Sequence, residues 1–286
     1  NNTVVFTGIS GNCDKAYSFN QNVTIGQATS DFSGNVTQSV VYEQVGEEVN
    51  IPDANLKAAL NKAIDSNRAD DQPITQSELE SLNVLRLANE NISNLEGLQY
   101  CTNLKDLFLV NLQLNDISPL ENLTNLTKLG IASCKLADIS SLGKITNLTT
   151  LGITNCKLAD ISQLGKCVNL ETLNLSKNYI SNISPLANLT NLQVLDLRKN
   201  CISDISPLKD LTNLTGVYLG DQKITGSEVT SVGDKATVNN MIKGLDGNPI
   251  AIANGDGYTY DSENNTVVFT GISGNCDKAY SFNQNV

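Results

Sequence analysis

The chain has 286 residues, contains no His and no Trp, and carries a formal net charge of −11 with an isoelectric point near 4.5. This acidic balance argues against a nucleic-acid backbone or an anionic lipid surface as the main partner, because both require basic stripes. The apolar fraction of 40% is sufficient for real cores, and no apolar run approaches the ~20 residues that span a bilayer, so no membrane insertion is expected.

The first 23 residues, Asn1 to Val23, recur letter for letter as Asn264 to Val286. Independent selection would not keep all of these positions identical, so the copies indicate a recent tandem duplication or deliberate construction. Residues 1–44 alternate apolar and polar side chains and contain turn signals such as Ser33-Gly34-Asn35. They are predicted to be the C-terminal strands of an immunoglobulin-like β-sandwich.

Residues 45–81 are predicted to form a small helical cap. Apolar residues recur at helical spacing between Ile51 and Ile64. Thr75 and Glu78 form a capping box that begins a second short helix. Such a cap covers the apolar edge that the first coil of an open-ended solenoid would otherwise expose.

Residues 82–224 repeat the pattern LxxLxLxx(N/C)x(I/L) in seven registers of 22 residues. Each coil cannot bury its apolar row alone, so stacking supplies a continuous core. The ninth position suits an Asn that bonds backbone in neighbouring turns. Asn178 and Asn200 fit that role, whereas packing is expected to replace it at Leu112, Cys134 and Cys156. On the convex side, a Ser N-cap with Pro at the first helical position is predicted at Ser118-Pro119, Ser184-Pro185 and Ser206-Pro207.

Two columns of the repeat could carry chemistry. Cys134 and Cys156 stack at roughly 5 Å, within disulfide range, but parallel side chains favour buried thiols. A column of carboxylates could hold calcium, although a solvated polar row is the simpler interpretation; it comprises Asp116, Asp138, Asp160 and Asp204, interrupted by Asn182. Without His, a CxxC pair, GxSxG or a phosphate loop, the sequence predicts no zinc site, no cofactor and no enzyme.

Residues 225–286 are predicted to begin the same sandwich that residues 1–44 end, because the strand pattern returns after the last coil. The six residues 45–50 reach roughly 20 Å, whereas seven coils rise roughly 33 Å. The N-terminal strands are therefore predicted to complete the sandwich of another chain, or to belong to the preceding unit of a covalent array.

The concave face is expected to carry the second, third, fifth, seventh and eighth positions of each repeat. Phe108 with Val110 forms an apolar spot near one end, and Tyr218 forms a polar aromatic spot near the other. Gly130, Ala132 and Gly152 are expected to leave a flat trough between them. Aromatic and Arg side chains are common binding hot spots, but isolated exposed apolar residues are also normal, so an unused surface stays an alternative. The candidate ligand-binding residues are Arg86, Phe108, Val110, Lys128, Asn174, Lys177, Asp196, Arg198, Lys199 and Tyr218.

Three stretches resemble the internalin family of Gram-positive bacterial surface proteins. They are the cap Ile51–Ile64 with Ile74–Leu79, the repeat phrase of Asn115–Leu120 and Ser203–Leu208, and the sandwich end Asn22–Gln38. The resemblance implies a secreted or cell-wall-attached protein whose concave sheet binds a host surface protein. The chain departs from the family in beginning inside the sandwich, a circularly rearranged order, and in having few concave aromatics.

The sequence thus predicts an α+β solenoid with a helical cap and a sandwich divided between the chain ends. Its predicted function is non-enzymatic binding of a protein ligand, with a secretory signal and wall anchor expected outside these residues. The alternative is an engineered or tandem scaffold that forms head-to-tail fibres through residues 1–44.

Overall fold

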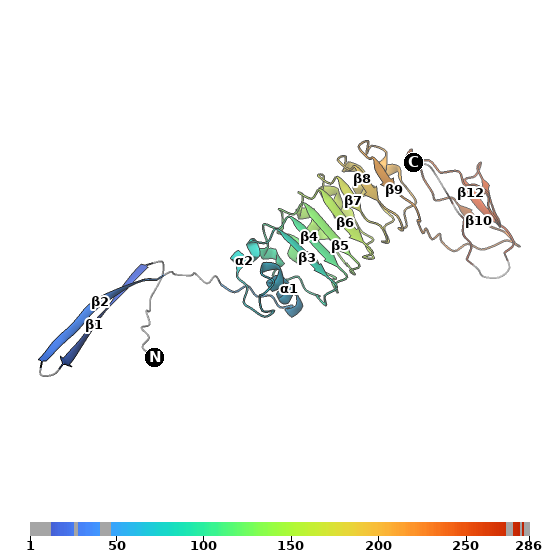
Figure 1. The fold of residues 1–286 in the computed structure, drawn as a ribbon. Coiled ribbons are helices and arrows are strands. Elements are labelled where there is room, and N and C mark those ends of the chain that lie inside the picture. Colours follow the sequence, from blue (N-terminus) through green and yellow to red (C-terminus); the bar gives the residue numbers. More distant parts are fainter. Residues whose placement is uncertain (1–12, 26–27, 41–46, 273–276, 281, 283–286) are drawn as a thin grey trace. The chain divides into compact units, whose positions relative to one another are not determined.

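A computed structural model describes residues 13–25, 28–40, 47–272, 277–280 and 282 (Figure 1). The chain divides into two compact units, Asn1–Glu47 and Glu48–Val286. The predicted strand around Phe6 and the first two residues of the predicted linker at residues 45–50 lie outside the described residues.

The N-terminal unit contains one antiparallel hairpin. Its strands are β1 (Cys13–Ile25) and β2 (Ala28–Val40), paired from Cys13 opposite Val40 to Ile25 opposite Ala28. An isolated two-stranded hairpin is marginally stable in water, since it has no second layer on which to bury its apolar side chains.

The helical cap consists of α1 (Ala54–Ile64) and α2 (Gln76–Glu80), and the predicted capping box of Thr75 and Glu78 is confirmed. One carboxylate fixes the cap to the first coil. Asp53 accepts from the backbone N–H of Leu56 at 3.1 Å and, through its other oxygen, from that of Ser93 at 2.8 Å. Burial raises the pKa of Asp53, but its backbone hydrogen bonds outweigh that effect and the net shift is downward.

The repeats form a parallel sheet of seven strands in chain order (Figure 1). Every paired residue lies opposite the residue 22 positions later, as Leu85 does with Leu107, so the predicted period is confirmed. The strands are β3 (Val84–Ala88), β4 (Asp106–Val110), β5 (Lys128–Ala132), β6 (Thr150–Thr154), β7 (Thr172–Asn174), β8 (Val194–Asp196) and β9 (Gly216–Tyr218).

Short 3₁₀ helices return the chain along the convex side. They span Leu98–Tyr100, Ser118–Leu120, Ser140–Lys144, Ser162–Lys166, Ser184–Asn188 and Ser206–Leu208. The predicted Ser N-caps are wrong, because each Ser is already the first helical residue. The side chain two residues before each Ser stabilises the turn into the helix instead: Asp116 accepts from the backbone N–H and the hydroxyl of Ser118, both at 2.8 Å, and Asn182 accepts from the N–H of Ser184. The carboxylate column of the sequence is thus a row of turn-stabilising side chains.

The ninth-position asparagines bond backbone as predicted. The amide of Asn178 donates to Ile153 O at 2.7 Å and accepts from the N–H of Cys156 at 3.0 Å. Asn200 repeats the arrangement one coil later, and Gln222 does so in the next. Cys134 and Cys156 are buried free thiols, as expected. The hydrogen bond between them raises the pKa of Cys156, and burial raises it further.

A small antiparallel sheet follows the repeats. It contains β10 (Ala236–Asn239), β11 (Tyr258–Asp261) and β12 (Thr266–Phe269) in the order β10-β12-β11. Its buried core comprises Ile242, Ile252, Val267 and Phe269. Within the described residues after β9, this is a single sheet, so a two-layered sandwich stays a prediction.

Candidate functional site: the concave sheet

The exposed face of the sheet follows from strand alternation. In β3, Leu85 and Leu87 are buried while Val84, Arg86 and Ala88 are exposed. The same alternation in β4 exposes Val110 at the end of the strand. Residues at the third, fifth and seventh positions therefore line one surface, and each lies beside its counterparts in the neighbouring coils.

At the N-terminal end of this face, an arginine lies over an aromatic ring. The guanidinium carbon of Arg86 is 5.1 Å from the ring centroid of Phe108, a cation–π distance. The Phe108 ring in turn covers Gly130, because a Cβ added there would lie 2.7 Å from Phe108 Cδ1. Gly130 is thus required by the ring, and the trough predicted at this coil is partly filled.

At the C-terminal end, three predicted residues meet. Arg198 donates to both carboxylate oxygens of Asp196, with Nη2 at 2.6 Å from Oδ2, and its guanidinium carbon is 5.1 Å from the Tyr218 ring centroid. Burial raises the pKa of Asp196, but the bonds from Arg198 shift it downward overall. The carboxylate therefore stays charged and fixes the guanidinium, while the Tyr218 ring is 49% exposed.

The middle coils are flatter and less charged. Nothing lies within 4 Å of a Cβ added at Gly152, so this glycine alone provides the open backbone that was expected at both Gly130 and Gly152. Lys128 is exposed on β5 and lies 3.9 Å from the Asp106 carboxylate. Asn174 bonds locally, since its Oδ1 accepts from the N–H of Ser176 at 3.0 Å.

Lys177 and Lys199 lie just past the strands, at the eighth position. This position is left-handed in all seven coils, with φ of 60° at Lys177 and 58° at Lys199. Asn, Ser or Asp occupies the other five coils; these residues tolerate this conformation better than a long side chain does. Both lysines are exposed at the margin of the face.

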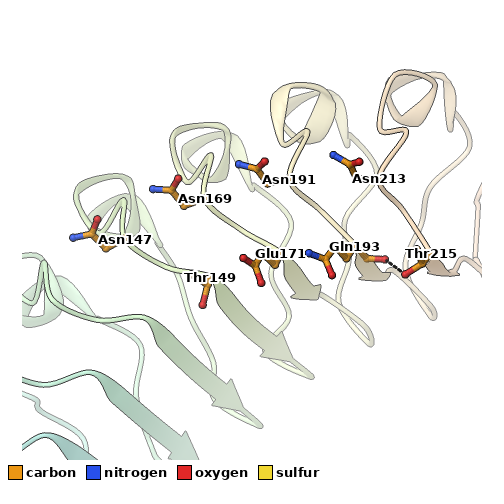
Figure 2. Close-up of a pocket in the computed structure, with 8 residues that line it drawn as sticks. All are labelled: Asn147, Thr149, Asn169, Glu171, Asn191, Gln193, Asn213 and Thr215. Atoms are coloured by element: carbon orange, nitrogen blue, oxygen red, sulfur yellow. Dashed lines mark hydrogen bonds between the residues drawn. The ribbon is translucent and has the colours of Figure 1, made fainter.

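Sequence reasoning missed a polar groove of about 630 Å³ at the N-terminal ends of the strands (Figure 2). Two rows of side chains line it: Asn147, Asn169, Asn191 and Asn213, and Thr149, Glu171, Gln193 and Thr215. The Asn row is structural, because each amide donates to a carbonyl of the preceding coil, as from Asn147 to Thr124 O at 2.8 Å. The sequence signal for this row is the Asn-Leu dipeptide that recurs every 22 residues, as at Asn147-Leu148.

The described part of the chain contains no cluster of three or more Asp, Glu, His or Cys side chains placed to hold a metal ion. In that same part, none of the helices has the length and apolarity needed to cross a membrane.

Comparisons with known proteins give two family matches. A model of leucine-rich repeats matches residues 146–188 and 190–229, and a model described as LRR adjacent matches residues 3–41. The second match includes the whole β1–β2 hairpin, and the segment 264–286 repeats only its first part. No curated protein sequence is significantly similar to the chain.

Solved structures of bacterial proteins are similar to part of this chain. Internalin C2 of Listeria monocytogenes is 35% identical over 61% of this chain and 77% of that chain, with a TM-score of 0.58. A second internalin of the same organism, inlF, is 34% identical over 62% of this chain and 58% of that chain, with a TM-score of 0.50.

Proposed function

The chain belongs to the internalin family of leucine-rich repeat proteins, and from that premise we propose that it binds a protein ligand through its concave sheet. The module is non-enzymatic in this proposal. It acts outside the bacterial cell, secreted or attached to the wall, and its ligand is a protein on a host cell surface. These last points rest on the family resemblance.

The observation that supports a concave site is the pair of arginine–aromatic contacts at the two ends of the sheet. Arg86 with Phe108 and Arg198 with Tyr218 each place a guanidinium 5.1 Å from a ring centroid. Aromatic and Arg side chains are enriched among residues that dominate binding energies. Between the two pairs, Gly152 leaves space for a partner to approach the backbone.

Pre-organisation strengthens the C-terminal pair as a binding anchor. Arg198 donates bidentate hydrogen bonds to Asp196, which hold its guanidinium in place. Binding a ligand therefore does not carry the entropic cost of ordering that long side chain. Asp196 is only 6% exposed, and it is therefore a positioning residue, whereas Arg198 and Tyr218 would touch the ligand.

Single substitutions test this proposal. Phe108→Ala and Tyr218→Ala are each expected to weaken binding of the labelled chain to host cells by tenfold or more, about 1.4–2 kcal/mol. Tyr179→Ala is the control, because Tyr179 is a more exposed aromatic residue (59%) outside the strands. Binding would be followed by flow cytometry on intact and protease-treated cells. Equal binding by all three variants, or binding that survives protease treatment, would refute a concave protein-binding site.

We also propose that copies of the chain associate head to tail by β-strand addition, in either a natural tandem array or an engineered scaffold. In this arrangement residues 225–286 begin an immunoglobulin-like sandwich that residues 24–44 of another unit complete. Its support is the identity of residues 1–23 with residues 264–286, together with the LRR-adjacent match at residues 3–41. Light scattering on the intact chain is expected to detect concentration-dependent species larger than a monomer; a uniform monomer contradicts the proposal.

A further inference from the structure

The sheet that follows the repeats has an incompletely covered core. Among the described residues, its buried apolar cluster has four members, and twice as many pack against them while still partly exposed: Ile224, Val238, Ile250, Tyr258, Tyr260, Ile272, Tyr280 and Phe282. The rings of Phe269 and Tyr280 are 6.2 Å apart, so the duplicated segment already contributes to this core. Partly exposed apolar side chains around so small a core favour a further layer of structure.

The same residues have different backbone conformations in the two copies. With an offset of 263 residues, Asp277–Tyr280 repeats Asp14–Tyr17. The first copy lies within β1, paired along its length with β2, whereas the second has no strand assignment. Among the described residues, the copy of this tetrapeptide that has a strand assignment is the one paired with β2.

We infer that β2 of one copy pairs antiparallel with the second duplicated segment of another copy, in the register that β1 already shows. That register places Lys278 opposite Gln38 and Tyr280 opposite Val36 of the partner, because Lys15 and Tyr17 face those residues in the hairpin. This inference rests on the self-association proposed above and specifies the strand, the direction and the register.

Pairing of β2 with either copy uses identical residues over the duplicated stretch. There the hydrogen-bond ladder between β2 and its partner strand is the same in either case and cancels from the comparison, whereas Thr24 and Ile25 of β1 lie outside the duplication. Pairing within the hairpin has the advantage of proximity. Pairing with the second copy brings β2 against Tyr280 and the half-exposed rings around Phe269, where it covers apolar surface that the hairpin by itself lacks. β1 therefore competes with the second duplicated segment of another copy for pairing with β2.

Matched proline substitutions in the full chain separate these roles, because two consecutive prolines remove one N–H on each side of a strand. The double variant Lys15→Pro/Ala16→Pro disables the competitor and is expected to strengthen association by about tenfold. The identical change at the second copy, Lys278→Pro/Ala279→Pro, is expected to weaken it at least as much. Both of these second-copy residues are exposed in the described structure, so the core around Phe269 is retained.

The variant Thr37→Pro/Gln38→Pro disables β2 and is expected to abolish association. Sedimentation velocity over a concentration series measures all of these chains. If Lys15→Pro/Ala16→Pro weakens association as the other two variants do, the intact β1–β2 hairpin docks as a unit. That result would refute the transfer of β2 from β1 to the second copy. If every variant associates like the intact chain, the strand assignment fails while self-association stands; if the intact chain and the competitor variant are both monomeric, the two proposals fail together.

Disulfide trapping tests the register in the intact fold. Residues directly opposite on antiparallel strands have Cβ atoms about 4.5–5.5 Å apart, close enough for a disulfide to form. Lys278→Cys combined with Gln38→Cys is expected to give intermolecular dimers under mild oxidation. Lys278→Cys with Ser39→Cys is the control, since the register places Ser39 opposite the residue equivalent to Asp14, one position away from Lys278. Equal yields from the two pairs would overturn the register.

Discussion

Two asparagine ladders hold this solenoid together, and they should contribute very differently to its stability. Asn178 is 3% exposed and bonds five backbone groups: it accepts from the N–H groups of Cys156 and Leu158 and donates to the carbonyls of Ile153, Leu175 and Ser176. Asn178→Ala removes this partner from all five, and of these the Leu175 carbonyl still accepts from the Asn200 amide. With about 1–3 kcal/mol for each buried group left unsatisfied, and partial relaxation or entry of water, we expect a loss of about 3–4 kcal/mol.

Asn147→Ala is the same substitution on the exposed ladder. It removes one hydrogen bond, to Thr124 O at 2.8 Å, and water can replace the amide there. The expected loss is therefore about 0.5–1 kcal/mol. Both sites lie within the repeats, so intrinsic propensities and the truncated atoms are matched.

Urea unfolding monitored by circular dichroism measures the difference. The Asn178→Ala midpoint should fall several-fold further than that of Asn147→Ala, with similar slopes, since solenoids unfold cooperatively only while neighbouring coils remain coupled. Equal losses in the two variants would refute the claim that burial, rather than the amide bond itself, determines the contribution of each ladder. A reduced slope in Asn178→Ala would show that the array had separated into independently unfolding parts.

The cap and the sheet provide two further tests. The Arg68 side chain holds the pKa of Glu78 at about 2, below its usual 4.5, so its stabilising effect is complete above about pH 4.5 and is lost as the pH falls toward 2. Glu78→Gln should therefore be less stable than the parent at pH 7 and nearly equal to it at pH 2 in urea titrations; a constant difference would contradict this. Gly130→Ala should destabilise by about 1–3 kcal/mol because its Cβ displaces Phe108, whereas Gly152→Ala should be nearly neutral; equal effects would exclude the ring contact.

The repeats could be predicted from the sequence because one physical requirement recurs in every coil. A Leu that must be buried at the same position of every coil determines where each strand and turn lies and the order of strands in the sheet. The pairing of each strand residue with the residue 22 positions later follows from this. The detail at Phe108 could not be predicted in this way, because the pattern places Gly130 beside it but does not determine the rotamer that covers it. The role of Asn147 could not be predicted for a related reason: it depends on the position of a carbonyl in the preceding coil, which the repeat pattern does not specify.

The two β segments are harder to predict because their strand signal is only local. Alternation and turn residues predict strands near both chain ends, and β1, β2 and β12 follow that signal. Whether such strands form one sheet or two layers depends on which partners are present. The duplicated segment shows this dependence directly, since one sequence is a strand beside β2 and has no strand assignment after Phe269.

The eighth position shows where recognition and folding compete. Its left-handed φ is imposed by the chain's turn out of the sheet, and Asn or Asp satisfies it with little strain. A lysine there gives up that advantage, yet two successive coils, at Lys177 and Lys199, have one. Both are next to the end of the sheet that carries Arg198, whose guanidinium is paired with Asp196. The left-handed backbone at these two lysines motivates the proposal that their side chains contact acidic groups of a ligand.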